Sequence, residues 1–331
     1  MIVRMVIFVL AGLAANPAHA LEPAGDAPLS GTTVVAGAER VPAGRENPPG
    51  FNPFRIACRL PGDVVDFVSS AFSESLWGWC GMAAGTGLLV AADGTLYDKS
   101  VAFGDSVGIP QENKTTAYGH FRIPLVNTEA SVLELPANLG GAMYFLGNGW
   151  FYAAITAGFL GWGVADSDLR AVRTASDLVE SMAATGLVTL TLKMSTGREN
   201  PNTRETPGGK WRLFRNPPAY MRQVNKYDAM PSGHLATAMG TLTVITYHYP
   251  DTWWIKPLGY TLMTVLGYQM VNSGVHWYSD YPLGIYIGYT FGRNVTGKRG
   301  KREEEMKAGI VPQVDPVVLG GGMGLKLRWR I

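Results

Sequence analysis

The stretch PSGHLATAMGTLTVITY, residues 231–247, says most about the fold of this chain. It carries no Asp, Glu, Lys or Arg, and Ser232 is a residue that favours the N-cap of a helix. Gly233 and His234 would then lie in the first turn, where free backbone N–H groups and the helix dipole can hold a phosphate. The alternative is an ordinary capped helix with a surface histidine. This stretch predicts a helix and, as one of two interpretations, an anion site at its start.

A second histidine, His276, stands four residues before Asp280. On a helix the two side chains share one face, so the carboxylate can orient one ring nitrogen and make the other a better nucleophile or base. A salt bridge on an exposed helix would have the same spacing. The neighbours Val275, Trp277 and Tyr281 are not those of an exposed helix, which favours a site.

Two cations precede these histidines in the sequence, at Lys193 and Arg198. A lysine at a helix end and an arginine five residues on would bring two positive charges to an anion. The alternative is a basic helix end that complements its own dipole. A metal site is not expected, because the other histidines of the expected mature chain, His120 and His248, lack metal-motif spacing.

Together these three elements resemble the type-2 phosphatidic acid phosphatase and vanadium haloperoxidase superfamily. The family pattern is Lys, six residues and Arg-Pro; then Pro-Ser-Gly-His; then Ser-Arg, five residues, His, three residues and Asp. The matching positions are Lys193 and Pro201, residues 231–234, and His276 with Asp280. The order and spacing agree, and the resemblance covers about residues 139–295.

The resemblance implies a metal-independent mechanism without a cofactor. His276 would attack phosphorus to form a phosphohistidine, Asp280 would orient it, and His234 would act as general acid and then as general base. The phosphate ligands that the resemblance and the neighbouring sequence suggest are Lys193, Arg198, Asn200, Ser232 and Gly233.

Two arginines of the family pattern are missing from this chain. Asn200 replaces the first, and Gln269-Met270 stands where the family has Ser-Arg. Because arginine binds phosphate through two parallel hydrogen bonds, the loss weakens the expected grip on the substrate. Replacements are expected from Arg198, which lies two residues from the family position, and from cations of the following loop: Lys210, Arg212, Arg222 and Lys226. An arginine in place of Met270 is expected to tighten phosphate binding.

The function that follows is phosphomonoester hydrolysis at the cell envelope by an acid phosphatase or phosphatidate phosphatase-like hydrolase. The expected substrate is a phosphorylated small molecule or lipid, with a lipid phosphate or diphosphate preferred. One alternative is a non-catalytic protein that binds phosphate or headgroups on the same scaffold. Vanadium-dependent halide oxidation is a further alternative, disfavoured because both arginines are absent. The net charge of +2 gives no reason to expect nucleic acid.

The chain is expected to form an all-α bundle of about six helices with irregular ends. The predicted divisions are a signal peptide at 1–20, an extended lead-in at 21–61, a helical phosphatase domain at 62–296 and a charged tail at 297–331. Helical periodicity begins near Asp63, and residues 76–92 are uncharged. The polar, turn-rich residues 93–136 are expected to form a long connection. Alternation at the end of the tail predicts a terminal strand at residues 325–331.

The signal peptide predicts export, with the active site facing the periplasm. Only 16% of the residues are charged, and residues 139–165 and 257–275 are uncharged and long enough to span a membrane. Association with the inner membrane is therefore preferred over a soluble periplasmic protein. Cys58 and Cys80 would meet an oxidising compartment, where a disulfide and two buried thiols are both open.

Overall fold

The structure, a computed structural model, describes residues 51, 53–73, 76–123, 128–307, 313–319 and 322–328. The all-α prediction is confirmed, and the described ranges contain nine α-helices with two antiparallel hairpins. The α-helices are α2 (Pro53–Ser73), α3 (Leu76–Val107), α4 (Leu139–Phe145), α5 (Gly149–Ala165), α6 (Leu169–Thr196), α7 (Pro217–Arg222), α8 (Gly233–His248), α9 (Ile255–Asn272) and α10 (Tyr281–Lys307). The strands are β1 (Thr115–Ile123), β2 (Thr128–Pro136), β3 (Gln313–Leu319) and β4 (Gly322–Arg328). Short 3-10 helices are η1 (Pro201–Thr203), η2 (Val224–Lys226) and η3 (Tyr278–Asp280).

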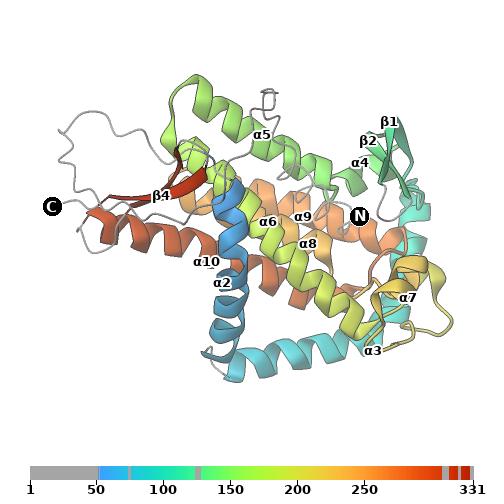
Figure 1. The fold of residues 1–331 in the computed structure, drawn as a ribbon. Coiled ribbons are helices and arrows are strands. Elements are labelled where there is room, and N and C mark those ends of the chain that lie inside the picture. Colours follow the sequence, from blue (N-terminus) through green and yellow to red (C-terminus); the bar gives the residue numbers. More distant parts are fainter. Residues whose placement is uncertain are drawn as a thin grey trace, which may run out of the picture.

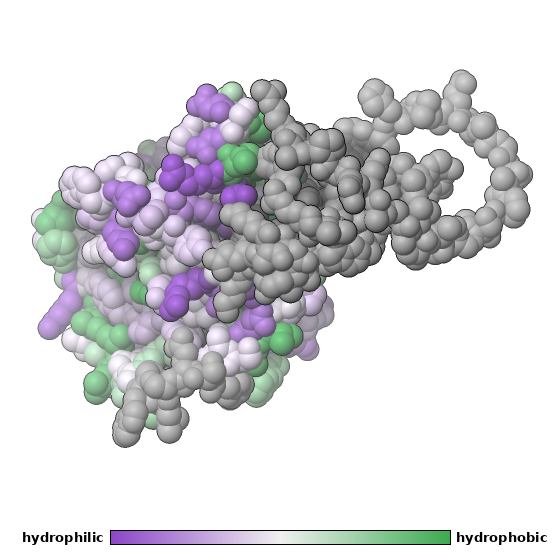
Figure 2. Space-filling view, turned by 90° about the vertical axis from the view of Figure 1, so that its left-hand side faces the viewer, coloured by the Kyte–Doolittle hydropathy of each residue, from purple (hydrophilic) through white to green (hydrophobic). Residues whose placement is uncertain are grey.

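Helices α6, α8 and α10 pack against one another at the centre of the molecule. Figure 1 shows α2 crossing this group and α3 running along one edge, where α3 contacts η3 and α9. One apolar cluster joins α5, α6, α8 and α9 through Tyr152, Leu178, Leu235 and Leu266. On the face that Figure 2 presents, hydrophobic and hydrophilic residues are interspersed outside the grey region.

Local capping explains where the two helices that carry the site begin and end. Asp168 caps α6 by accepting hydrogen bonds from the N–H groups of Arg170 and Ala171. The same helix ends at Gly197, whose φ of 51° lies in the left-handed region that glycine enters readily. Ser232 caps α8 as predicted, because its hydroxyl accepts from the N–H of Leu235 at 3.4 Å. These caps fix where α6 ends and where α8 begins, and the Thr196 hydroxyl joins the two places by donating to the carbonyl of Met230 at 2.6 Å.

A close approach between α8 and α10 requires glycine. A Cβ atom on Gly288 would lie 2.0 Å from the carbonyl oxygen of Ala236, and one on Gly284 would lie 2.5 Å from that of Ser232. Both neighbours are backbone atoms and cannot rotate away. Glycine at these two positions therefore allows the start of α8 to lie directly on the start of α10.

The N-terminal half is more regular than the sequence predicted. Helix α2 begins at Pro53, inside the expected lead-in, and Ile56 is buried, so packing extends the helix upstream. Helix α3 continues past Asp93 to Val107, and the β1–β2 hairpin follows, so the predicted connection over 93–136 is wrong. Asp93 does not end the helix because its carboxylate has a buried partner, described below. Residues 1–50, with the predicted signal peptide, lie outside the described residues.

The two uncharged segments, which were expected to be long enough to span a membrane, form helices, but the first is divided into two. Residues 139–165 divide into α4 and α5, because Asn148 begins a new helix by accepting from the N–H of Trp150. Residues 257–275 are largely within α9. Within the described ranges, no helix combines the length and the apolar character needed to cross a membrane.

The tail and the cysteines also differ in part from expectation. Helix α10 runs to Lys307 and so includes the charged run at 298–305, while β4 overlaps the predicted terminal strand and pairs with β3. Cys58 and Cys80 are both exposed and free, so neither of the two alternatives held open for them describes the structure.

Candidate active site

The three sequence motifs meet at one end of the helical centre. The backbone N–H of Ser232 donates to the carbonyl of Asp280 at 3.0 Å, which joins the second motif to the third. The indole Nε1 of Trp277 donates to the carbonyl of Glu199 at 2.8 Å and so joins the first motif to the third. The N–H of Ala229, two residues before the second motif, donates to the carbonyl of Arg198 at 3.0 Å and so joins the first motif to the second. Segments far apart in the sequence therefore form one connected site.

The two predicted catalytic histidines face each other directly. Nδ1 of His234 lies 3.1 Å from Nε2 of His276, and the two rings are at 75° to each other. His276 is fully buried and His234 is 5% exposed. The structure thus brings together the pair that the sequence predicted, with Nε2 of His276 as the nitrogen that points toward the partner ring.

Asp280 lies behind His276, but the two are not on one helix as predicted. His276 lies outside any helix or strand, and Asp280 ends η3, one residue before α10 begins. The Asp280 carboxylate accepts from the N–H of Trp277 at 2.7 Å, which folds the chain back and places Oδ2 3.4 Å from Nδ1 of His276. The spacing of four residues between His276 and Asp280 therefore reflects a capping turn and not a shared helix face. At 3.4 Å the contact is electrostatic, since Nδ1 lacks a well-aligned hydrogen bond.

Burial keeps His234 neutral in the free protein. Desolvation holds the pKa of His234 well below its usual range, and the neighbouring His276 and Lys193 lower this pKa further. Nε2 of His234 is buried without a hydrogen-bond partner in the described structure. An anion beside this ring would raise its pKa and allow it to carry a proton.

Ser232 and Gly233 take the positions predicted for a phosphate cradle. Both are buried at the start of α8. The hydroxyl of Ser232 caps this helix, while its backbone N–H donates to the carbonyl of Asp280. The backbone N–H groups of the first turn lie at the positive end of the helix dipole. This helix start therefore offers an electropositive wall next to His234.

Lys193 reaches the site, but another carboxylate already holds it. Its side chain is 1% exposed, and Nζ forms an ion pair with Oδ2 of Asp228 at 2.9 Å. The hydroxyl of Tyr220 donates to the other oxygen of Asp228. Burial alone would raise the pKa of Asp228, but the charge of Lys193 and these contacts outweigh it and lower the pKa. Asp228 therefore stays ionised and occupies the ammonium group that a phosphate would need.

Arg198 lies behind Asp280 rather than beside the histidine pair. Its guanidinium donates to Oδ1 of Asp280 at 2.6 Å and to Oδ2 of Asp93 at 2.6 Å, and all three side chains are fully buried. The expectation that Arg198 swings into the site as a phosphate ligand is corrected, because both sides of its planar group are already bonded to carboxylates. The sequence analysis did not find Asp93, although a carboxylate directly after the uncharged residues 76–92 was a signal.

The other expected phosphate ligands contribute little positive charge. Asn200 is buried, and its side-chain oxygen has no hydrogen-bond partner in the described structure. Met270 is fully buried in the apolar cluster with Leu235 and Leu266, so an arginine there would place a charge in the core. The prediction that Met270→Arg tightens phosphate binding is therefore corrected. This substitution is expected to lower the stability of the fold instead.

Cations of the loop after the first motif are likewise engaged by carboxylates. Glu205 accepts from Lys210 at 2.6 Å and from Arg212 at 2.7 Å, and it lies 3.9 Å from Lys226. These three side chains neutralise an acidic residue of their own loop. They do not replace the missing arginines.

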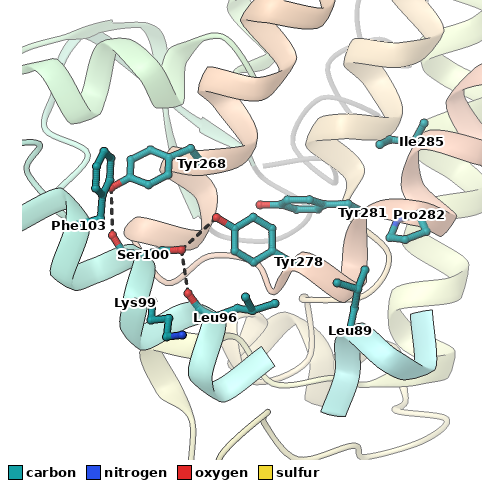
Figure 3. A pocket seen from close by; sticks show the side chains of 10 residues that line it. All are labelled: Leu89, Leu96, Lys99, Ser100, Phe103, Tyr268, Tyr278, Tyr281, Pro282 and Ile285. Carbon is teal, nitrogen blue, oxygen red and sulfur yellow. Dashed lines mark hydrogen bonds between the residues drawn. The ribbon is translucent and has the colours of Figure 1, made fainter. Parts of the chain in front are cut away.

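An aromatic groove lies on the α3 side of the histidine pair. It has a volume of about 560 Å³ and is lined by Leu89, Leu96, Lys99, Ser100, Phe103, Tyr268, Tyr278, Tyr281, Pro282 and Ile285. Figure 3 shows Tyr278 and Tyr281 side by side between α3 and the start of α10. The ring of Tyr281 is 6.4 Å from that of His276, so one aromatic side chain separates the groove from the histidine. Within the described residues, no group of three or more side chains could hold a metal ion.

Comparison with known proteins gives one finding. A family model described as the PAP2 superfamily matches residues 174–303. This range contains all three motifs, the helices α8 and α9, and most of α6 and α10. No curated protein and no solved structure matches the chain.

Proposed function

Because residues 174–303 belong to the PAP2 superfamily, whose members generally hydrolyse phosphate esters, we propose that the chain is a phosphomonoesterase that works through a phosphohistidine at His276. The observation that carries the proposal is the buried triad of His234, His276 and Asp280, with contacts of 3.1 and 3.4 Å. It supplies a nucleophile, a second histidine for proton transfer and a carboxylate that orients the nucleophile.

The proposed reaction has two steps. Nε2 of His276 attacks phosphorus, the bond from phosphorus to the ester oxygen breaks, and His234 donates a proton to the departing oxygen. A water then attacks the phosphohistidine, His234 accepts its proton, and the N–P bond breaks to release inorganic phosphate. Substrate must displace the 3.1 Å contact between the rings, because phosphorus has to reach Nε2 of His276. A bound phosphate dianion would raise the pKa of His234 and prepare it as the acid.

A lipid phosphate or diphosphate is the substrate class that we propose. The support is the groove of about 560 Å³, whose lining is mainly aromatic and aliphatic and which lies one ring away from His276. Apolar grooves with few polar groups bind hydrocarbon through the area that they remove from water. The weak supply of cations also favours a substrate that gains affinity from its hydrocarbon part.

We also propose a location in the cell envelope, with the site on the periplasmic side and the protein associated with the inner membrane. The predicted signal peptide supports export. Trp253 and Trp254, directly before α9, and Leu258 and Tyr260, in its first two turns, are each exposed, and Trp and Tyr are enriched where proteins meet a membrane surface. Fractionation of the cells between periplasm and membrane tests this part, and recovery only in the cytosol would contradict it.

Release of phosphate from p-nitrophenyl phosphate and from phosphatidic acid, with and without vanadate, tests the activity. We expect vanadate-sensitive turnover in the wild type and none above background in His276→Ala. Equal background rates for the two proteins on both substrates would contradict the proposed activity and favour the non-catalytic, phosphate-binding alternative.

A substitution in the groove tests the substrate class separately. Leu96→Trp fills the groove and is expected to raise KM for phosphatidic acid about tenfold, with KM for p-nitrophenyl phosphate unchanged. Leu88→Trp is the matched control, because Leu88 is on the same helix, is 75% exposed and does not line the groove. Equal effects on both substrates, or none on the lipid, would contradict a hydrocarbon site here.

A further inference from the structure

A buried row of three charges connects α3 to the histidine pair. The two NH₂ groups of Arg198 point in different directions, one to Asp280 and the other to Asp93. Ser279 strengthens the row, since its hydroxyl donates to Oδ2 of Asp93 and its N–H donates to Oδ1 at 3.3 Å. Burial of three ionised groups is costly unless each is hydrogen-bonded. The hydrogen bonds of Arg198 and Ser279 to the two carboxylates meet this requirement, but they do not explain why the charges are buried here.

The row has an uneven charge. Two carboxylates and one guanidinium carry a formal net charge of −1, and all three side chains are fully buried. If Arg198 were bonded to Asp280 alone, the pair would be neutral, and Asp280 would polarise His276 only weakly. Because Asp93 shares the guanidinium, Asp280 keeps much of its negative charge on the oxygen that faces His276.

No other group around His276 offsets this charge within the described structure. His234 faces Nε2 and is kept neutral by burial, which lowers its pKa. Lys193 is paired with Asp228. Burial, with Asp280 as the next cause, holds the pKa of Tyr281 well above its usual range, so this phenol is also neutral. The excess negative charge therefore acts mainly on the His276 ring.

We infer that Asp93 is a positioning residue that shares Arg198 with Asp280, so that the negative charge of Asp280 is less compensated toward His276, and that it stabilises the positively charged form of this ring. The inference rests on the proposed function, in which the ring keeps a proton on Nδ1 while Nε2 bonds to phosphorus. Positive charge then develops on the imidazole during the attack. The excess charge contributed by Asp93 is placed to stabilise that state.

Removal of one charge tests the inference, and Asp93→Asn does so with little change in shape. We expect the Nδ1–H proton resonance of His276, followed by NMR of ¹⁵N-labelled histidine, to move upfield, because the facing carboxylate attracts this proton less strongly. With p-nitrophenyl phosphate we expect kcat to fall about tenfold while KM changes less than twofold. A folded Asp93→Asn protein with an unchanged His276 resonance would overturn the inference.

Two further variants separate charge from structure. Asp93→Glu restores the charge and is expected to recover the wild-type position of the His276 resonance and the wild-type kcat. Asp177→Asn is the matched control, because Asp177 is also fully buried and contacts His248 at 2.8 Å, away from the histidine pair. It is expected to leave the His276 resonance unchanged, and an equal upfield shift in this control would contradict a specific role of Asp93.

The double variant Asp93→Asn/Arg198→Met keeps the inference testable if the single variant does not fold. It removes one positive and one negative charge, leaves the net charge at −1 and is expected to keep the His276 resonance near its wild-type position. An upfield shift of this resonance in the double variant would overturn the inference. The NMR result does not depend on turnover, so a wild type that lacks phosphatase activity would refute the proposed function while the NMR spectra still decide the role of Asp93.

Discussion

The two sides of the candidate site are built very differently. The histidine side (His234, His276 and Asp280) is buried and connected to three segments of the chain. The cation side (Lys193 with Asp228) has a single lysine that a carboxylate already holds at 2.9 Å. Under the proposed function, the groups for the chemical step and the groups that bind the phosphate are separate parts of this site. The first are in place, whereas Asp228 restricts the second.

The largest expected effect comes from Asp280, on which the histidine side depends. Asp280→Asn keeps the shape but removes the charge that orients His276 and the partner of Arg198. We expect kcat for p-nitrophenyl phosphate to fall by about 10³, within the range for loss of acid–base assistance, with a small change in KM. Steady-state kinetics measures this, and circular dichroism checks the fold. A loss below tenfold in a folded protein would show that the histidine side does not control the rate.

The next effect concerns the contact between α8 and α10 that brings the histidines together. Gly288→Ala forces a Cβ atom to within 2.0 Å of a backbone oxygen, so we expect a loss of about 2–3 kcal/mol in the free energy of unfolding. Gly297→Ala is the control on the same helix, because a Cβ there meets nothing within 4 Å. It is expected to stabilise α10 by about 0.5–1 kcal/mol. Denaturant unfolding measures both, and equal values would disprove the tight contact.

A third prediction concerns the ion pair of Lys193 with Asp228 and tests whether this pair limits phosphate binding. Asp228→Asn removes the carboxylate that holds the ammonium group, and we expect inorganic phosphate to inhibit about tenfold more strongly, or roughly 1.4 kcal/mol. Asp251→Asn removes the same charge at the far end of α8 and is expected to leave the inhibition constant unchanged. If Asp228→Asn also left it unchanged, Asp228 would not compete with the substrate.

The smallest effect is a dependence of stability on pH that His234 produces. Its pKa is below the usual value in the folded protein, because burial disfavours the charged ring. The unfolded chain therefore binds more protons than the folded one below about pH 6.5, and stability is lost as the pH falls. His234→Gln is expected to remove up to about 1.4 kcal/mol per pH unit from this slope. Unfolding between pH 5 and 7 measures it, and identical slopes would contradict a neutral, buried His234.

The sequence predicted the features that depend on local signals. Ser232 begins α8 as expected, since an N-cap and an uninterrupted run of small and apolar residues are readable from neighbours. The pairing of His276 with Asp280 was also predicted, but the 3-10 turn that creates it was not. A spacing of four residues suits both a helix and a capping turn, so the spacing alone could not distinguish them.

The features that depend on distant partners were missed. Asp93 seemed to end an apolar segment, whereas Arg198, 105 positions later, supplies the charge that lets α3 continue. The partner of Lys193 lies in a loop, and Met270 turns into the core although its family position suggests a phosphate ligand. Motif spacing fixes where a residue occurs in the chain. It does not fix which way the side chain points or what already neutralises it.

Trapping of the covalent intermediate tests the central claim most directly. Acid-sensitive, base-stable labelling from a ³²P-phosphomonoester, followed by peptide mapping, is expected to place one phosphoryl group on His276 in the wild type and none in His276→Ala. His234→Ala is expected to retain the label longer, since hydrolysis of the intermediate lacks its base. Label on another residue, or turnover with no label under rapid quenching, would contradict the account.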